Sequence, residues 1–254
     1  MNYTKPTLIP AIAFVISICL LLFTGCATEQ SKFQIASGDK EMHTAQYNDA
    51  LIAYKKANTF LPSDQNQLRV AGAQINLGQY QAAHTTLAGI KSPSASSYYL
   101  SALCYLSLAD PTNAQTDIEK SLQYDPIDIH ALSLYGEILM ANHNYLRSAQ
   151  IYNQTLALCT QCDIKSELLH NQTMAYLYSG QYNDAKETYQ HYLQSQRHIT
   201  SQDHKLAGAI AWGAGDHPLA MTHWQDLNQR DKAQIIAAID QDNDIYKPLT
   251  QSNF

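Results

Sequence analysis

A short phrase recurs along the chain at intervals of about 34 residues. Each copy begins with residues typical of a turn, usually including glycine or tyrosine, and ends with a small residue. The pentapeptide Gln-Tyr-Asn-Asp-Ala occurs in full at 46–50 and again at 181–185. The small residues that close the copies are Ala50, Ala83, Ala114, Ser148, Ala185 and Ala220, so neighbouring copies lie 33, 31, 34, 37 and 35 residues apart. A sustained period of this length indicates a repeat architecture, in which each unit packs only against its neighbours.

The residue types at fixed places in each copy indicate a pair of helices. Small residues stand where two helices must approach to about 8–10 Å, and aromatic residues three or four positions away fill the space between neighbours. In the first copy Gly38 falls in the first helix, Tyr47 at the turn, and Tyr54 and Ala57 in the second helix. A glycine before each turn would supply the left-handed conformation that ends the first helix. We therefore predict two antiparallel helices per copy.

This pattern resembles the tetratricopeptide repeat (TPR), and the resemblance runs from Ser31 to about Arg230. It implies an all-α fold, a right-handed solenoid of about six helix pairs. The units are expected at about 31–63, 64–94, 95–128, 129–165, 166–200 and 201–230, followed by a capping helix and a loose tail at 231–254.

The N-terminal segment 1–25 is dominated by an apolar run. Leu8–Phe23 has sixteen residues, fewer than the roughly 20 that a membrane-crossing helix needs, and this length suits the middle of a secretory signal peptide. The sequence 22–26 resembles a bacterial lipobox, although Phe23 stands where leucine is preferred. The resemblance implies cleavage before Cys26, whose side chain would be diacylated. The alternative is an uncleaved signal anchor.

Lipid attachment at Cys26 would make the chain a lipoprotein anchored to a membrane surface. Residues 26–30 are expected to form the acylated N-terminus and a short linker. Because Ala27 stands where an aspartate would signal inner-membrane retention, the resemblance implies the outer membrane, with the protein facing the periplasm.

The charge balance excludes some partners. The formal net charge is −6, and it becomes −7 if segment 1–25, with Lys5 and no acid, is removed. An acidic chain is a poor match for nucleic acid, and it argues against electrostatic adhesion to anionic lipid. With 45% hydrophobic residues the chain can build a core.

The sequence offers little for catalysis. The ten histidines are scattered, without the spacing of metal ligands. The stretch Trp212–Pro218 contains two glycines but lacks the Lys-Ser/Thr of a phosphate loop, and no serine nucleophile elbow occurs. We therefore predict no enzyme activity, no cofactor, no metal and no small-molecule substrate.

Cys159 and Cys162 form a C-x-x-C pair where the repeat spacing lengthens to 37. In an oxidising periplasm the favoured interpretation is a disulfide that staples this joint. Two free thiols and a thiol-exchange site are the alternatives. Cys104 lies in an apolar run and is expected to be buried.

The first helices of stacked pairs line the concave face of a solenoid. The groove-lining positions of the family, carried onto this sequence, are Ile35, Met42, His43, Leu68, Ile75, Tyr99, Leu103, Leu106, His130, Glu137, Met140, His170, Met174, Leu177, Tyr178, Lys205 and Trp212. The set is mostly apolar and aromatic, which suits an amphipathic helix or an extended apolar segment. The carboxylate clamp of chaperone-binding members is absent, because Ile35 and Asp39 occupy its places. The alternative is that these residues pack against neighbouring helices.

The layout of lipobox, short linker and about six repeats resembles the TPR lipoproteins of tight-adherence (Flp) pilus loci and the pilotins of type IV pili. Both help a secretin, the outer-membrane pore subunit, to reach or assemble in its membrane. The resemblance implies a secretin or pilus assembly subunit as the partner. The alternatives are a periplasmic adaptor for a protease or peptidoglycan enzyme, and a component of outer-membrane barrel assembly.

Overall fold

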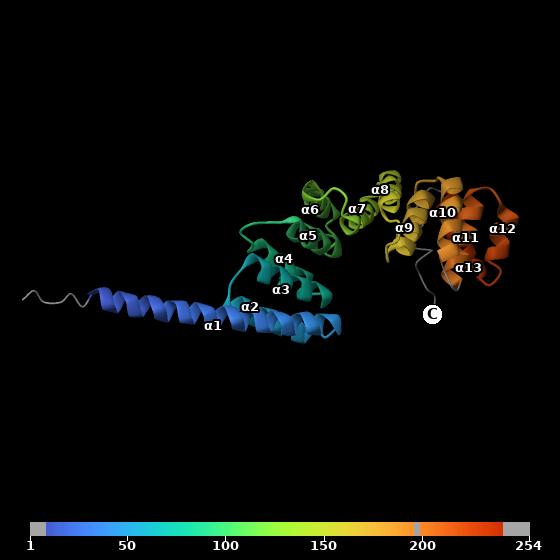
Figure 1. Cartoon of the computed structure of the whole chain (residues 1–254). Helices are drawn as coiled ribbons and strands as arrows, with labels where there is room; N and C mark the ends of the chain where they lie inside the picture. The colour runs from blue at the N-terminus through green and yellow to red at the C-terminus, as the bar shows by residue number, and fades with distance from the viewer. Residues whose placement is uncertain (1–8, 196–198, 241–254) are drawn as a thin grey trace, which may run out of the picture. The chain divides into compact units, whose positions relative to one another are not determined.

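The computed structural model describes residues 9–195 and 199–240, with side chains from Cys26 onward. Within these ranges the chain forms thirteen helices and no strand (Figure 1), which confirms the predicted all-α class. Residues 1–8 and the side chains of 9–25 in the predicted signal peptide, and the predicted tail after Asp240, lie outside the described residues.

The chain divides into two compact units between Asp110 and Pro111. In the first unit consecutive helices pack against one another, and the third also packs against the fifth. These helices are α1 (Ile9–His43), α2 (Tyr47–Phe60), α3 (Asp64–Asn76), α4 (Tyr80–Ala88) and α5 (Ala95–Ser107).

The second unit begins with α6 (Pro111–Tyr124), and each helix again packs on the next as far as α12, while the last helix, α13, packs on α11. The remaining helices are α7 (Ile129–Ala141), α8 (Tyr145–Leu158), α9 (Lys165–Tyr178), α10 (Tyr182–Ser195), α11 (Ser201–Gly213), α12 (His217–His223) and α13 (Gln229–Asp240). The division falls inside the third predicted repeat, between its two helices.

Side-chain caps fix where several first helices of the pairs begin. Ser63 accepts a hydrogen bond from the Asn66 amide at the start of α3, and Asp128 accepts two at the start of α7. Ser94 and Thr200 form full capping boxes at the starts of α5 and α11. Each cap satisfies amide groups that the first helical turn leaves without a partner.

Every turn within a helix pair has the same backbone geometry. A residue with positive φ stands five positions before the closing small residue, and the next amide bonds back to the carbonyl five residues earlier, as in a Schellman motif. The positive-φ residues are Ala45, Gly78, Ala109, His143, Gly180 and Gly215, with φ between 56° and 84°. The predicted glycine is therefore present in three turns, and the prediction is wrong for the other three.

Replacing Ala45 with glycine is expected to stabilise the first pair by about 0.5–1 kcal/mol. A left-handed conformation costs a residue with a β-carbon about 1–2 kcal/mol, and the greater freedom of glycine in the unfolded chain offsets part of the gain. Gly78→Ala is the matched control, and it should destabilise the protein by a similar amount. Urea denaturation followed by circular dichroism measures both, and shifts of the same sign would contradict the expectation.

A small residue in the first helix faces a large one sixteen positions later in the second. A β-carbon built on Gly38 would lie 2.5 Å from the ring of Tyr54, and one on Gly136 would lie 2.5 Å from the ring of Tyr152. Such approaches are too close for any side chain, so glycine lets the two helices pack around the aromatic ring. Both rings are buried, at 4% and 0% exposure.

Residues 26–30, predicted as a short linker, are helical. Helix α1 continues without interruption from Ile9 through His43. Between Cys26 and Ser37 the sequence contains no glycine or proline that would end a helix. Cys26 is therefore joined to the first helix pair by helix rather than by an irregular linker.

The structure joins Cys159 to Cys162 by a disulfide with a Cα–Cα distance of 5.4 Å. The bridge lies in the connection between α8 and α9, and Cys159 belongs to the buried cluster that contains Tyr152 and Leu168. Cys104 is a buried free thiol, and burial raises its pKa to about 11.

Candidate binding surface

In the first unit, predicted groove residues gather on the first helix of each pair. On α1, α3 and α5 these residues stand seven positions apart, which places each pair on one helix face. All of them are half-buried, so each rests on the core and keeps part of its surface exposed. We call this set the first-unit apolar surface: Ile35, Met42, Leu68, Ile75, Tyr99, Leu103 and Leu106.

The cores beneath hold this surface in place. Leu68 and Ile75 pack on the cluster of Ala71, Leu87 and Cys104, and Met42 packs on the cluster around Tyr54 and Val70. Gly72 lies between Leu68 and Ile75 on α3, and apart from the neighbouring backbone of α3 no atom lies within 4 Å of the place its β-carbon would take. The middle of the surface is therefore open, since packing does not require glycine at that position.

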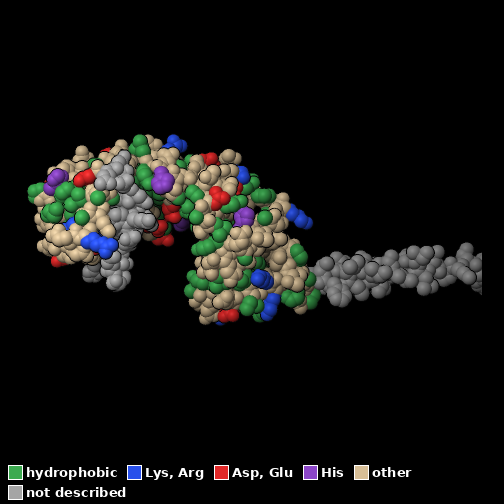
Figure 2. Space-filling model, turned by 180° about the vertical axis from the view of Figure 1, so that it is seen from behind, with side chains coloured by type: hydrophobic (Ala, Val, Ile, Leu, Met, Phe, Trp, Pro, Cys, Tyr) green, Lys and Arg blue, Asp and Glu red, His purple; other side chains and the backbone are tan. Residues whose placement is uncertain are grey.

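A charged pair interrupts the first-unit apolar surface, because Asp39 stands between Ile35 and Met42 on one face of α1. Asp39 lies 3.9 Å from the Arg69 guanidinium and accepts a 2.7 Å hydrogen bond from the Tyr54 hydroxyl. Burial, with the hydrogen bond to Asp39, raises the pKa of Tyr54. On the face shown in Figure 2, hydrophobic side chains lie among charged side chains of both signs. The apolar side chains are thus the feature that sets this surface apart.

The second unit presents fewer of the predicted groove residues. Met174 and Leu177 are 8% and 1% exposed and belong to the core with Leu206 and Tyr189, so their assignment to a groove is wrong. Their helix, α9, packs on α10 and shares this core with α11. The repeat period alone does not show that α10 and α11 cover this face of α9. Lys205 is likewise 7% exposed.

The other predicted residues of the second unit remain at least partly exposed: His130, Glu137, Met140, His170, Tyr178 and Trp212. Trp212 is already engaged, because its indole donates a 3.0 Å hydrogen bond to Asp240 and stacks on His217 at 4.0 Å. In the first unit His43 is exposed at the end of α1.

Burial shifts the pKa values of two predicted groove residues in the second unit, Glu137 and His170. Burial raises the pKa of Glu137 to about 7, and the nearby Glu167 carboxylate adds to the shift. Burial also lowers the pKa of His170, against the opposing effects of Asp203 and Glu167. Both groups are therefore less readily charged than in water.

Within the described ranges, no three histidine, cysteine or acidic side chains come together as metal ligands would. Over the same part of the chain, no helix combines the length and the apolar character needed to cross a membrane.

No family model matches the sequence, and no curated protein is detectably similar to it. Solved structures of similar fold do exist. PilW, described as a widely conserved type IV pilus biogenesis factor, is 18% identical with a TM-score of 0.67, over 78% of this chain and 91% of that one. Pseudomonas aeruginosa PilF is 12% identical with a TM-score of 0.64, over 85% and 98%.

A third similar structure is a tetratricopeptide repeat protein from Parabacteroides merdae. It is 14% identical with a TM-score of 0.63, over 89% of this chain and 94% of the other. At such low identity these similarities concern the fold alone. The chain folds as a TPR solenoid.

Proposed function

We propose that this protein is a non-catalytic scaffold that binds a segment of another protein on the first-unit apolar surface. The observation that carries the proposal is the row of partly exposed apolar side chains on three successive first helices, with Gly72 leaving the middle open. Contiguous exposed apolar side chains usually mark an interaction site. The partner would present an amphipathic helix or an extended apolar segment.

We further propose that the scaffold assists the assembly or localisation of a surface pilus or its secretin. The fold similarity to PilW and PilF supports this pathway. In this proposal Cys26 carries acyl chains that anchor the protein to the outer membrane, on its periplasmic side. A periplasmic adaptor for a protease or cell-wall enzyme would use the same surface, and partner identity distinguishes the two.

Photo-crosslinking in living cells tests the proposal. Benzoylphenylalanine replaces Leu103, and mass spectrometry identifies the adduct. A secretin or pilus subunit is the expected product. An adduct with a protease or cell-wall enzyme would support the scaffold function but contradict the role in pilus assembly. The absence of any protein adduct would contradict the proposed binding surface.

The double variant Leu68→Glu with Leu103→Glu should reduce partner binding at least about tenfold. Two carboxylates would have to lose water inside an apolar contact, and truncating a single central contact residue already costs about 1–2 kcal/mol or more. Co-purification with the crosslinked partner measures the loss, and circular dichroism checks the fold.

Leu108→Glu is the matched control. Leu108 is the C-cap residue of the helix that carries Leu103; it is 41% exposed and does not belong to the first-unit apolar surface. It should bind like the unaltered protein. Equal losses in the control and in the double variant would point to a general effect of charge rather than to this surface.

A further inference from the structure

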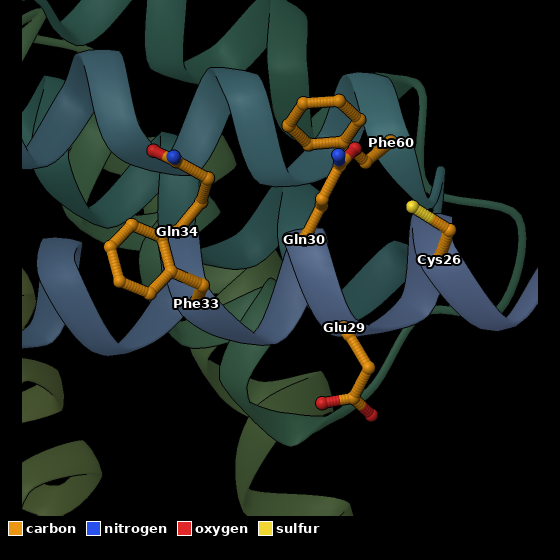
Figure 3. A pocket seen from close by; sticks show the side chains of 6 residues that line it. All are labelled: Cys26, Glu29, Gln30, Phe33, Gln34 and Phe60. Carbon is orange, nitrogen blue, oxygen red and sulfur yellow. The ribbon is translucent and has the colours of Figure 1, made fainter.

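Large aromatic side chains are exposed around Cys26, at the start of the first helix pair. Phe33 is 71% exposed and Phe60 is 38% exposed, although burial of either ring would be favourable. Figure 3 shows that both border a shallow pocket that Cys26 also lines, with the side chains of Gln30 and Gln34 between them. Leu61, next to Phe60, is 43% exposed. We call Phe33, Phe60 and Leu61 the N-terminal apolar patch.

Cys26 and this patch share one side of the helix pair. Cys26, Gln30, Phe33 and Gln34 stand at positions i, i+4, i+7 and i+8, which lie on one face of a helix. The end of α2 is fixed beside them, because the Ser31 hydroxyl donates a 3.1 Å hydrogen bond to the Ala57 carbonyl. The orientation of the patch relative to the cysteine is therefore set by packed helices.

The local charge differs from that of the whole chain. Around the patch, at 26–36 and 52–62, the sequence has three lysines (Lys32, Lys55, Lys56) and one acid, Glu29. Lys32 pairs with Glu29 at 2.9 Å, while Lys55 and Lys56 are exposed on α2. Exposed lysines on α2, together with the exposed aromatic rings, suit an anionic lipid surface.

We propose that the N-terminal apolar patch rests on the membrane and lays the first helix pair along the lipid surface. This inference rests on the proposed acylation of Cys26. Because residues 26–30 are helical, acyl chains at Cys26 would hold α1 itself at the interface. Phe33 lies about 10 Å along the helix from Cys26, so it reaches the lipid only when α1 lies flat. Phenyl rings and lysines are typical of helices that lie in this way.

A flat α1 also orients the binding surface. Ile35 is two residues after Phe33 and belongs to the first-unit apolar surface, so a helix turns it about 200° away. With Phe33 on the lipid, Ile35 faces away from the membrane. The anchor would thus present the scaffold's binding surface to the periplasm.

Benzoylphenylalanine at Phe33, Phe60 or Ile35, one position at a time in the full chain in living cells, tests this arrangement. Mass spectrometry of the photolysed peptides distinguishes phospholipid adducts from protein adducts. We expect lipid adducts at Phe33 and Phe60 at least about ten times more abundant than at Ile35, because the interface is only about 5–10 Å deep. Ile35 is the matched control, on the same helix and of similar apolar character.

Labelling with a palmitate analogue, with Cys26→Ser as the negative control, separates the two proposals. If Cys26 is labelled but Phe33 gives no lipid adduct, or gives a protein adduct, the proposed contact of the N-terminal apolar patch with the membrane is wrong and the proposed acylation stands. An unlabelled Cys26 would overturn the proposed anchor and the docking together. Lipid adducts at all three positions would show an α1 surrounded by lipid, which also contradicts the proposed orientation.

Discussion

Trp224→Ala is expected to destabilise the second unit by about 3–5 kcal/mol, the usual cost of removing a large buried aromatic side chain. Trp224 is fully buried in the cluster that holds Leu206, Ile210 and Ile235, and its indole donates a 3.1 Å hydrogen bond to the Lys205 carbonyl. Substitution would open a cavity and remove the hydrogen bond that the indole donates to that carbonyl. Urea denaturation followed by circular dichroism measures the change.

Trp212→Ala is the matched control. Trp212 stands on the neighbouring helix, but it is half-buried. Its hydrogen bond to Asp240 is exposed and its ring is only partly buried, so Trp212→Ala should cost less than Trp224→Ala, about 1–2 kcal/mol. Equal losses for the two variants would mean that burial of the Trp224 ring does not decide the stability of this pair.

A double-mutant cycle tests why Trp224 needs a glycine opposite. A β-carbon on Gly208 would overlap the Trp224 indole, so Gly208→Ala should cost about 1–3 kcal/mol by overpacking. In the second repeat the corresponding residues are Ala71 and Leu87, in one buried cluster. Gly208→Ala together with Trp224→Leu should therefore cost less than the sum of the single changes, by about 1 kcal/mol or more. Strict additivity would contradict the pairing.

The contact between a small residue of the first helix and a large residue sixteen positions later could have been predicted from the sequence. Gly38, Gly136 and Gly208 each precede a large aromatic residue by sixteen positions, whereas the repeat period draws attention to spacings near 34. The pairing is not uniform, because Thr173 stands opposite Tyr189 in the fifth repeat and turns its hydroxyl back to the Leu169 carbonyl. Because the small residue is glycine in some repeats and threonine in another, its role in helix packing becomes clear only from the structure, where it faces the aromatic ring.

The helix pairs and their turns could be predicted because they depend on local chemistry repeated six times. The exposed fraction of each predicted groove residue could not be predicted from the sequence. Ile35 and Leu177 are both apolar residues of first helices, yet one is half-buried and the other is 1% exposed. The difference lies in how neighbouring helices cover each face, which a periodic pattern leaves open. The repeat period also gives no sign of the division into two compact units between Asp110 and Pro111.

Glu137→Gln is expected to stabilise the protein by up to about 3 kcal/mol at pH 8 and to have little effect at pH 4. The folded pKa of Glu137 is about 7, above the ordinary 4.5, because the carboxyl is buried and lies near Glu167. Between these values the folded protein binds more protons than the unfolded chain, so its stability falls as the pH rises. Above pH 7 the charged carboxylate is buried at full cost, and a neutral amide of the same shape avoids that cost.

The difference in unfolding free energy between Glu137→Gln and the unaltered protein, measured from pH 4 to pH 8, isolates this effect. Burial lowers the pKa of His170, but this group is present in both proteins and its contribution cancels in the difference. Glu187→Gln is the control, because Glu187 is exposed on α10 and its loss should change little. A flat difference curve would mean that Glu137 is ionised in the folded protein at its ordinary pKa. A stability difference that rises from pH 4 to pH 8 would mean that the Glu137 carboxyl is protonated in the folded protein at low pH, and that its ionisation destabilises the second unit above neutral pH.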